Sequence, residues 1–187
     1  MNFLRTLIIK PSSMGDIVQA LPVLTALKET HPGAHVSWLV ASPFADLLEG
    51  HPRLEEVVVF DRERYARIGR SVGTTLEFAQ FLKGLRQKRF TTVIDLQGLF
   101  RSGLVALASG APSRVGFRDA RELAPLFYTA EVVVGRSEIH AVDRYLALAR
   151  HAGLHPPKAT DHLPVSAARR AAIRRRLAEA GLGSGEP

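Results

Sequence analysis

LRTLIIKPSSMGDIVQALPVLTALKET, residues 4–30, predicts a strand, a polar loop and a helix in direct succession. Residues 4–9 form an almost uninterrupted apolar run rich in leucine and isoleucine, which is typical of a buried strand. The loop follows at residues 10–16, and apolar residues then recur at helical spacing from residue 17 to residue 30. A His-Pro-Gly sequence at residues 31–33 ends the helix. A strand–loop–helix unit of this kind is the building block of α/β proteins.

The same alternation continues along the chain. Further strands are expected at residues 35–40, 56–60, 91–96, 114–117 and 131–134, and further helices at residues 43–49, about 74–87, about 98–109, 139–151 and 166–181. Strands that alternate with helices indicate a parallel, doubly wound α/β sheet.

Composition excludes several classes of protein. The chain has 187 residues, of which 46% are hydrophobic and 23% charged, so it can bury a core and is not a disordered protein. It contains no cysteine, which excludes disulfides, thiolate metal sites and cysteine nucleophiles. The N-terminal apolar run is too short for a signal peptide, and no apolar stretch reaches the roughly 18 residues of a membrane-spanning helix. We therefore expect a cytoplasmic protein, at most peripheral to a membrane.

The C-terminal part differs from the rest in composition. Residues 166–181, SAARRAAIRRRLAEAG, predict a basic helix with Ser166 as its N-cap, and the chain ends in the linker-like sequence GSGEP. We expect one domain over residues 1–165, followed at residues 166–187 by a helix and the start of an interdomain linker. The helix could alternatively bind anionic lipid or nucleic acid.

Three loops that follow strands are unusually polar. They cover residues 10–16, residues 61–70, which contain four arginines, and residues 95–102. Ligands of open parallel sheets bind outside the carboxyl ends of the strands, so these loops are the candidate site. The net charge is +7, and residues 61–101 carry nine basic but only four acidic side chains. This basic excess suits an anionic partner, such as a phosphorylated substrate, an acidic membrane or nucleic acid.

Asp16 in the first loop has two interpretations. It could be an ordinary N-cap of the following helix, paired with Gln19 in a capping box. It could also face a ligand, because Ser12, Ser13 and Gly15 allow the backbone to approach one closely. The helix N-terminus would keep the carboxylate ionised in either case. The loop contains neither the Walker A pattern nor the dinucleotide fingerprint, which argues against nucleotide hydrolysis and hydride transfer.

A series of short motifs resembles one family over nearly the whole chain. The sequence is similar to the N-terminal domain of the lipopolysaccharide heptosyltransferase I group of glycosyltransferase family 9. The motifs are KxSSMGD with ALP at residues 10–22, IDxQGLxRS at residues 94–102, ARE at residues 120–122, LFY at residues 126–128 and HAVDR at residues 140–144. Each motif is weak alone, but five in the same order are specific. The SSMGD form favours the type that adds the first heptose.

The resemblance implies a fold and a reaction. Family members have two facing Rossmann-like domains, the GT-B arrangement, and this chain corresponds to the acceptor-binding half without the donor-binding half. The resemblance implies that Asp16 is the catalytic base for transfer of heptose, with inversion, from ADP-heptose to a 3-deoxy-octulosonic acid (Kdo) residue of the lipopolysaccharide inner core. It implies no cofactor and no metal. The partners would be the lipid A–Kdo acceptor, the ADP-heptose donor and the inner face of the cytoplasmic membrane, and no nucleic acid.

The expected substrate-binding residues come from four regions. They are Lys10, Ser12, Ser13 and Gly15 in the first loop, Arg62 and Arg64 in the arginine loop, Gln97 and Gly98 after the fourth strand, and Arg121 and Arg144 in the later motifs. Guanidinium groups suit the carboxylates and phosphates of the acceptor, and an amide can hydrogen-bond a sugar hydroxyl. Each arginine could instead be a solvated or structural residue, with Glu122 or Asp143 as ion-pair partners of the last two.

Other functions remain open on the sequence alone. The chain could be a non-catalytic basic module that binds an anionic lipid or saccharide, or a family member that transfers another sugar or the second heptose. His151 and His155 have ligand spacing, but the glycine between them and the proline after them favour surface histidines over a metal site. No helix-turn-helix, zinc-finger or RNA-recognition signature supports nucleic-acid binding.

Overall fold

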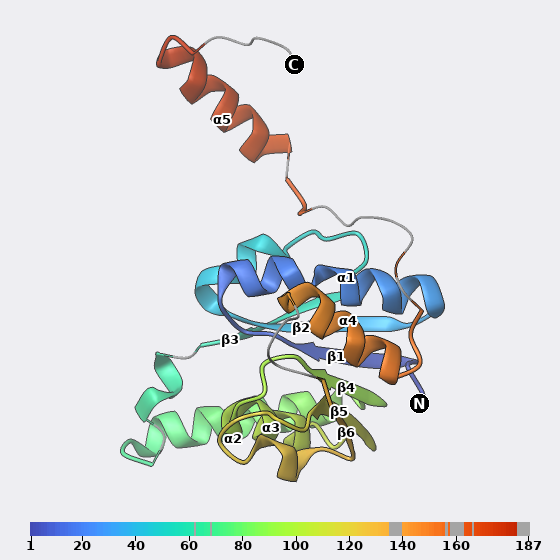
Figure 1. Cartoon of the computed structure of the whole chain (residues 1–187). Coiled ribbons are helices and arrows are strands. Elements are labelled where there is room, and N and C mark those ends of the chain that lie inside the picture. Colours follow the sequence, from blue (N-terminus) through green and yellow to red (C-terminus); the bar gives the residue numbers. More distant parts are fainter. Residues whose placement is uncertain are drawn as a thin grey trace.

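The chain folds around one parallel sheet, as predicted (Figure 1). The computed structural model describes residues 1–61, 63–67, 69–134, 140–155, 157, 163–165 and 167–182. The strands are β1 (Arg5–Ile9), β2 (His35–Ala41), β3 (Glu56–Phe60), β4 (Thr92–Asp95), β5 (Ser113–Phe117) and β6 (Ala130–Val132). Their order is β3-β2-β1-β4-β5-β6, and every neighbouring pair is parallel. The crossovers therefore reverse direction between β1 and β4, which is the doubly wound topology.

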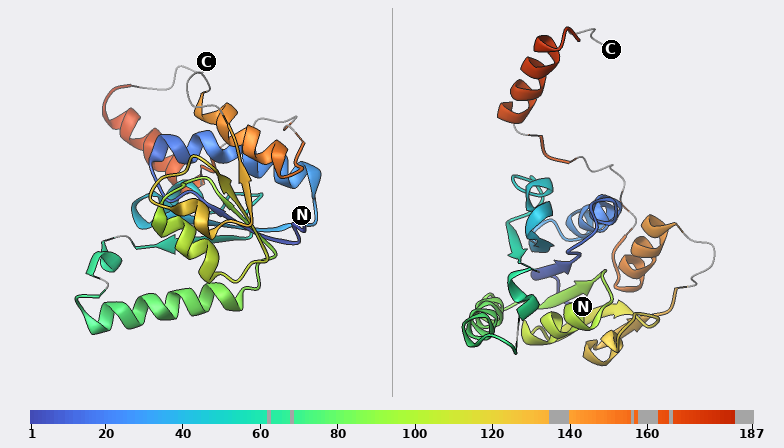
Figure 2. Two further views of the ribbon diagram at one scale, coloured as in Figure 1. Left: turned by 60° about the horizontal axis from the view of Figure 1, so that its bottom comes forward. Right: turned by 90° about the vertical axis from the view of Figure 1, so that its left-hand side faces the viewer.

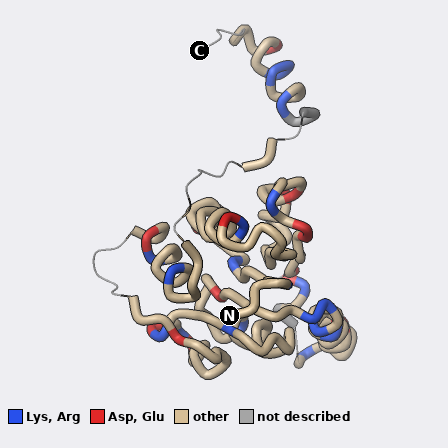
Figure 3. Tube along the Cα trace, turned by 90° about the vertical axis from the view of Figure 1, so that its right-hand side faces the viewer, with Lys and Arg blue, Asp and Glu red and all other residues tan. Residues whose placement is uncertain are grey.

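Helices cover both faces of this sheet. They are α1 (Met14–Thr30), α2 (Val72–Gln87), α3 (Phe100–Ala108), α4 (Ala141–His151) and α5 (Ala167–Glu179), with short 3₁₀ helices η1 (Ser42–Leu47), η2 (Arg64–Arg67) and η3 (Ala124–Phe127). α1 and α4 lie side by side on one face, and α2 and α3 lie on the other (Figures 1 and 2). α5 stands apart from both layers and carries basic residues along its length (Figure 3).

The strands alternate their side chains between two apolar cores. Ile8 and Trp38 belong to the core under α1 and α4, whereas Leu7 and Ile9 belong to the core over α2 and α3. A strand buried on both faces needs apolar residues at every position, which explains the continuous run in β1. The predicted strands and helices are all present, with boundaries that differ by up to three residues, but the short helix predicted at residues 43–49 is the 3₁₀ helix η1, and η2 and η3 were not predicted. The largest shift is in α1, which begins at Met14 instead of residue 17.

Glycines allow η3 and the residues after it to pack closely against the sheet and α3. A Cβ on Gly116 of β5 would lie 2.2 Å from the ring of Tyr128, and a Cβ on Gly103 of α3 would lie 2.5 Å from Phe127. Real Cβ atoms do not approach neighbours this closely, so both rings occupy space that only glycine leaves. The position of Tyr128 matters below because its hydroxyl reaches Asp95.

We expect Gly116→Ala to lower the free energy of unfolding by about 1–3 kcal/mol, because the added methyl group overpacks against the Tyr128 ring. Gly84→Ala is the matched control, since a Cβ at Gly84 in α2 meets nothing within 4 Å. That change should be neutral or stabilise by up to about 1 kcal/mol. Urea unfolding of both variants measures the difference, and equal effects would contradict the packing argument.

Candidate active site

The loops after β1 and β4 lie next to each other at the point where the sheet reverses direction. Ligands of doubly wound sheets bind in the crevice at this switch point. The first loop is tied to β2 through its backbone. The Lys10 carbonyl accepts from the Trp38 indole N–H at 3.2 Å, and the Pro11 carbonyl accepts from the Ala41 N–H at 3.0 Å. The loop therefore has a fixed path into α1.

Asp16 occupies the third position of α1, and the interpretation of it as an N-cap paired with Gln19 is wrong. Ser13 is the N-cap. The Ser13 backbone N–H donates to Asp16 Oδ2 at 3.0 Å, and the Ser13 hydroxyl donates to the same oxygen at 3.2 Å. These two hydrogen bonds from the N-cap to the third helical residue hold the first turn of α1, which explains why the helix begins earlier than the apolar spacing predicted.

Lys10 lies almost fully buried beneath this carboxylate. The residue is 5% exposed, and its Nζ is 3.7 Å from Asp16 Oδ2 and 5.4 Å from the ring centroid of Tyr145 on α4. Burial lowers the pKa of Lys10, and the charges of Asp16 and Asp95 oppose that shift. The ammonium group thus contacts the Asp16 carboxylate and is buried away from the open crevice surface.

Asp16 itself is accessible and ionised. Its side chain is 38% exposed. Partial burial acts to raise the pKa of Asp16, but the Ser13 N–H, the Lys10 charge and the Ser13 hydroxyl together outweigh it, so the pKa falls below the ordinary 3.8. All three contacts are made to Oδ2. The arrangement can hold an ionised carboxylate in one orientation at the edge of the crevice and let it accept a proton.

The β4 loop is organised by a second, fully buried carboxylate. Asp95 Oδ1 accepts from the backbone N–H groups of Gln97 at 2.9 Å and Gly98 at 3.1 Å, and Oδ2 accepts from the Tyr128 hydroxyl at 2.8 Å. Burial raises the pKa of Asp95, and these donors together with Ser102 oppose the shift. Burial and the Asp95 charge also raise the pKa of Tyr128, which keeps it a donor.

Gly98 is required at the turn of this loop. Its φ is +68°, and a Cβ would lie 3.1 Å from the Cβ of Ala120. Its carbonyl accepts from the Arg121 N–H at 2.9 Å, so the loop is joined to residues 120–121 by backbone as well as by packing. The predicted pair Gln97 and Gly98 is therefore part of the crevice wall. Asp95 and Tyr128, which fix this wall, were not predicted as site residues, although both lie in motifs of the resemblance.

A cavity of about 220 Å³ opens on the α2/α3 side of the two loops. Its apolar walls come from the strand ends and α3, and its polar groups include Ser12, Gln97, Arg101 and Glu122. Among the described residues, the buried Oε1 of Gln97 has no hydrogen-bond partner. Ser12, four residues before Asp16, lines the cavity, and Asp16 itself does not.

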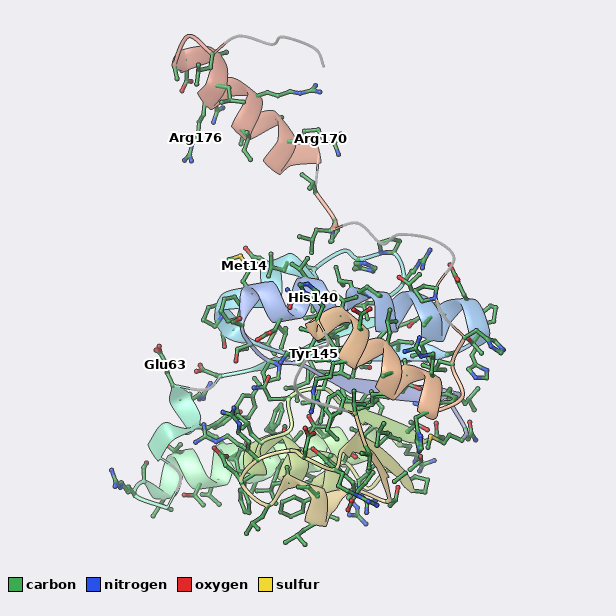
Figure 4. The ribbon with its side chains drawn as sticks, viewed as in Figure 1. Met14, Glu63, His140, Tyr145, Arg170 and Arg176 are labelled. Atoms are coloured by element: carbon green, nitrogen blue, oxygen red, sulfur yellow. The ribbon has the colours of Figure 1, made fainter. Side chains whose placement is uncertain are left out.

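The arginine loop lies at the same edge of the sheet, where Figure 4 labels Met14 at the start of α1 and Glu63 before η2. Arg62 lies outside the described residues. Arg64 is exposed, and its Nε pairs with Glu77 of α2 at 2.7 Å. Arg70 is exposed. Arg64 and Arg70 can therefore meet an anionic ligand at the outer rim of this edge.

The two later arginines differ in their surroundings. Arg144 pairs with Asp119 and lies with its guanidinium carbon 4.2 Å from the Phe117 ring centroid, so it ties α4 to the sheet. The sequence had offered Asp143 as a possible ion-pair partner of Arg144, but the partner is Asp119. Arg121 is exposed beside the β4 loop. Glu122 accepts from the Phe100 N–H at 3.3 Å and so caps the N-terminus of α3.

The histidines and acidic groups do not form a metal centre within the described ranges. His151 and His155 are both exposed, and α4 ends at His151, as the sequence favoured. In the part of the chain that the structure describes, no three His, Asp or Glu side chains gather to hold a metal ion. In the same part, no helix has the length and apolarity to cross a bilayer.

The comparison with known families decides the assignment of the chain. The model of glycosyltransferase family 9 (heptosyltransferase) matches residues 78–181, which is more than half of the chain. The chain belongs to glycosyltransferase family 9. The resemblance found in the motifs is thereby confirmed at the level of the family.

Individual family members support this. Lipopolysaccharide heptosyltransferase 1 of Escherichia coli O18:K1:H7 is 35% identical over 144 residues, which is 75% of this chain and 44% of the relative. The enzyme of the same name from Pseudomonas aeruginosa is 32% identical over 97% of this chain and 50% of its own length. The structure of E. coli heptosyltransferase WaaC with ADP-2-deoxy-2-fluoro heptose matches with a TM-score of 0.73 and 32% identity, over 84% of this chain and 51% of that one. The chain spans about half the length of the curated relatives it matches. Its fold is that of one half of a GT-B glycosyltransferase.

We expect Asp16→Asn to lower stability in a pH-dependent way. The folded state lowers the pKa of this carboxyl below 3.8. Its stabilising contribution is therefore fully present above that value and is lost as the pH falls through the folded pKa. Urea unfolding of the native chain and the variant at pH 7, 4 and 3 should show a gap in unfolding free energy that narrows in acid. A gap that stays constant would show that the Asp16 charge is not involved.

Proposed function

We propose that this chain is the acceptor-binding half of a heptosyltransferase of the lipopolysaccharide inner core. The enzyme transfers heptose from ADP-heptose to a hydroxyl group of Kdo with inversion at the anomeric carbon. The observation that carries the proposal is the Asp16 carboxylate, which lies at the switch-point crevice, ionised and exposed on one side, with Oδ2 held by Ser13 and Lys10.

In this reaction Asp16 is the general base. It accepts the proton of the acceptor hydroxyl while that oxygen attacks the anomeric carbon of the donor, and the bond to the ADP oxygen breaks on the opposite side. A carboxylate with a low pKa is a modest base, so its main contribution is the correct position of an ionised acceptor for the proton. The scheme needs no cofactor and no metal ion.

The helix N-termini of this half argue that the ADP group binds elsewhere. Diphosphates in Rossmann-like folds are bound by free N–H groups at helix N-termini that face the crevice. Here Asp16 lies at the start of α1, and Glu122 accepts from the Phe100 N–H at the start of α3. A diphosphate at either position would meet a like charge. We therefore assign the donor mainly to the half that the longer relatives possess. The related WaaC, about half of which this chain covers, has been solved with an analogue of ADP-heptose.

The acceptor would occupy the crevice and its rim on this half. Ser12 and Gln97 line the cavity and would contact sugar hydroxyls, and Gly15 leaves open space at the start of α1. The arginine loop, with Arg62 and Arg64, and the exposed Arg121 would bind the carboxylates and phosphates of lipid A–Kdo. Lys10, Gly98 and Arg144 would act behind the surface by shaping the loops, and the exposed Ser13 would hold Asp16 in place. The lipid-linked acceptor implies work at the inner face of the cytoplasmic membrane.

We expect Asp16→Asn to reduce heptose transfer about 10²–10⁴-fold, because the variant cannot accept the proton. Transfer from ADP-heptose to Kdo-lipid A is measured with residues 1–165 joined to the C-terminal half of the E. coli O18:K1:H7 relative, and the 187-residue chain alone should show little or none. Glu49→Gln, which changes an exposed carboxylate just after η1, is the matched control and should retain full activity. Retention of activity by Asp16→Asn would favour the alternative, a basic module that binds an anionic saccharide without performing chemistry.

The division between donor and acceptor is testable on the chain itself. Isothermal titration calorimetry should detect binding of a soluble Kdo disaccharide bearing phosphorylated glucosamine but no tight binding of ADP-heptose. Glu122→Gln removes one of the carboxylates at the helix N-termini and should improve any residual ADP binding, since the like charge is lost. Tight binding of ADP-heptose by the native chain would contradict the assignment of the donor to the other half.

A further inference from the structure

The turn after β4 is held from inside by one carboxyl group. Asp95 is the last residue of β4 and is fully buried. Its Oδ1 accepts from the backbone N–H groups of Gln97 at 2.9 Å and Gly98 at 3.1 Å, which closes the turn. The second oxygen of a carboxyl group removed from water also needs a donor, because a buried acceptor without a partner is destabilising.

Tyr128 supplies that donor from a distant part of the chain. Its hydroxyl donates to Asp95 Oδ2 at 2.8 Å, across 33 positions of the sequence. The Tyr128 ring lies over Gly116 of β5, where a Cβ would be only 2.2 Å from it, and the Tyr128 N–H donates to the Pro125 carbonyl at 3.0 Å. The backbone of β5 and of η3 therefore fixes the tyrosine, and the tyrosine fixes Asp95.

The turn carries or contacts two of the groups that we propose bind the acceptor. Gln97 lines the cavity next to the first loop, and Tyr128 itself does not. The Gly98 carbonyl accepts from the N–H of the exposed Arg121 at 2.9 Å. A shift of the turn would therefore move both the Gln97 amide and the backbone of Arg121.

We infer that Tyr128 is a positioning residue for acceptor binding, because its hydroxyl holds Asp95 and thereby the turn after β4. This turn presents Gln97 to the cavity and fixes the backbone of Arg121 at the rim. The role in acceptor binding rests on the proposed function, whereas the control of the turn by Tyr128 does not.

The inference separates binding from chemistry. The described contacts of the Asp16 carboxylate come from Ser13 and Lys10, and not from the turn after β4. Loss of the Tyr128 hydroxyl should therefore weaken acceptor binding and leave the step of proton transfer nearly unchanged.

The first test is hydrogen exchange at the turn, followed by NMR in the 187-residue chain. Tyr128→Phe keeps the ring and removes only the hydroxyl. The amides of Gln97 and Gly98 should then exchange about 3- to 10-fold faster, because their hydrogen bonds to Asp95 are weakened. Unchanged exchange at both amides, with the fold intact by circular dichroism, would overturn the inference.

Thr6→Val is the matched control for loss of a buried hydroxyl. Thr6 is fully buried in the first half of β1, away from the crevice end of the strand, and its hydroxyl donates to the Phe3 carbonyl at 3.0 Å. The variant should leave exchange at residues 97 and 98 at the native rate. An equal acceleration in Thr6→Val would show that lower stability, and not the Tyr128 hydroxyl, controls the turn.

A second arm measures transfer in the fusion with the C-terminal half of the E. coli relative. Tyr128→Phe should raise KM for the acceptor about 3- to 10-fold and leave kcat and KM for ADP-heptose within about 2-fold, and Thr6→Val should change none of them. A fall in kcat with an unchanged KM for the acceptor would overturn the inference. Faster exchange at the turn combined with full transfer by Asp16→Asn would refute Asp16 as the base and leave the role of Tyr128 standing.

Discussion

The buried ammonium group of Lys10 is the constraint on which the site depends. A cation removed from water is strongly destabilising unless anions and polar groups surround it. Lys10 is 5% exposed, and the charges of Asp16 and Asp95 both act on it from the starts of α1 and of the β4 loop. Tyr145 covers it from α4. One charge at the end of β1 thus joins the two crevice loops and a helix that follows more than 100 residues later in the chain.

The sequence was informative wherever a feature depends on local pattern. Strands such as β1 are buried on both faces and so are continuously apolar, and the Gly98 turn follows a buried strand directly. The start of α1 could also have been predicted, because Ser13 and Asp16 have the spacing of a capping box. The interpretation of Asp16 as the N-cap missed this. The contacts of Lys10 with the Tyr145 ring and of Asp95 with Tyr128 join residues far apart, and no local periodicity encodes them. Those contacts appear only once the chain is folded.

In this fold, the groups at the helix N-termini decide whether a ligand can place negative charge there. A free N-terminus at the switch point is a diphosphate site. In this chain Asp16 and Glu122 place carboxylates there, and the basic groups lie farther out, on the arginine loop and at Arg121. Positive potential at the rim and negative charge at the centre suit a ligand whose anionic groups are peripheral and whose reacting group is a neutral hydroxyl. The proposed Kdo-lipid A acceptor has this distribution, whereas a nucleotide sugar has its charge next to the reacting carbon.

The proposed base is organised within this half of the protein. The described groups that contact Asp16 are Ser13, the N-cap of α1, and Lys10, which follows β1. Tyr145 of α4 covers Lys10 from the same side of the sheet. Closure of a second domain is therefore not needed to ionise or orient the carboxylate. It has only to bring the anomeric carbon within reach of an acceptor hydroxyl that already faces its base.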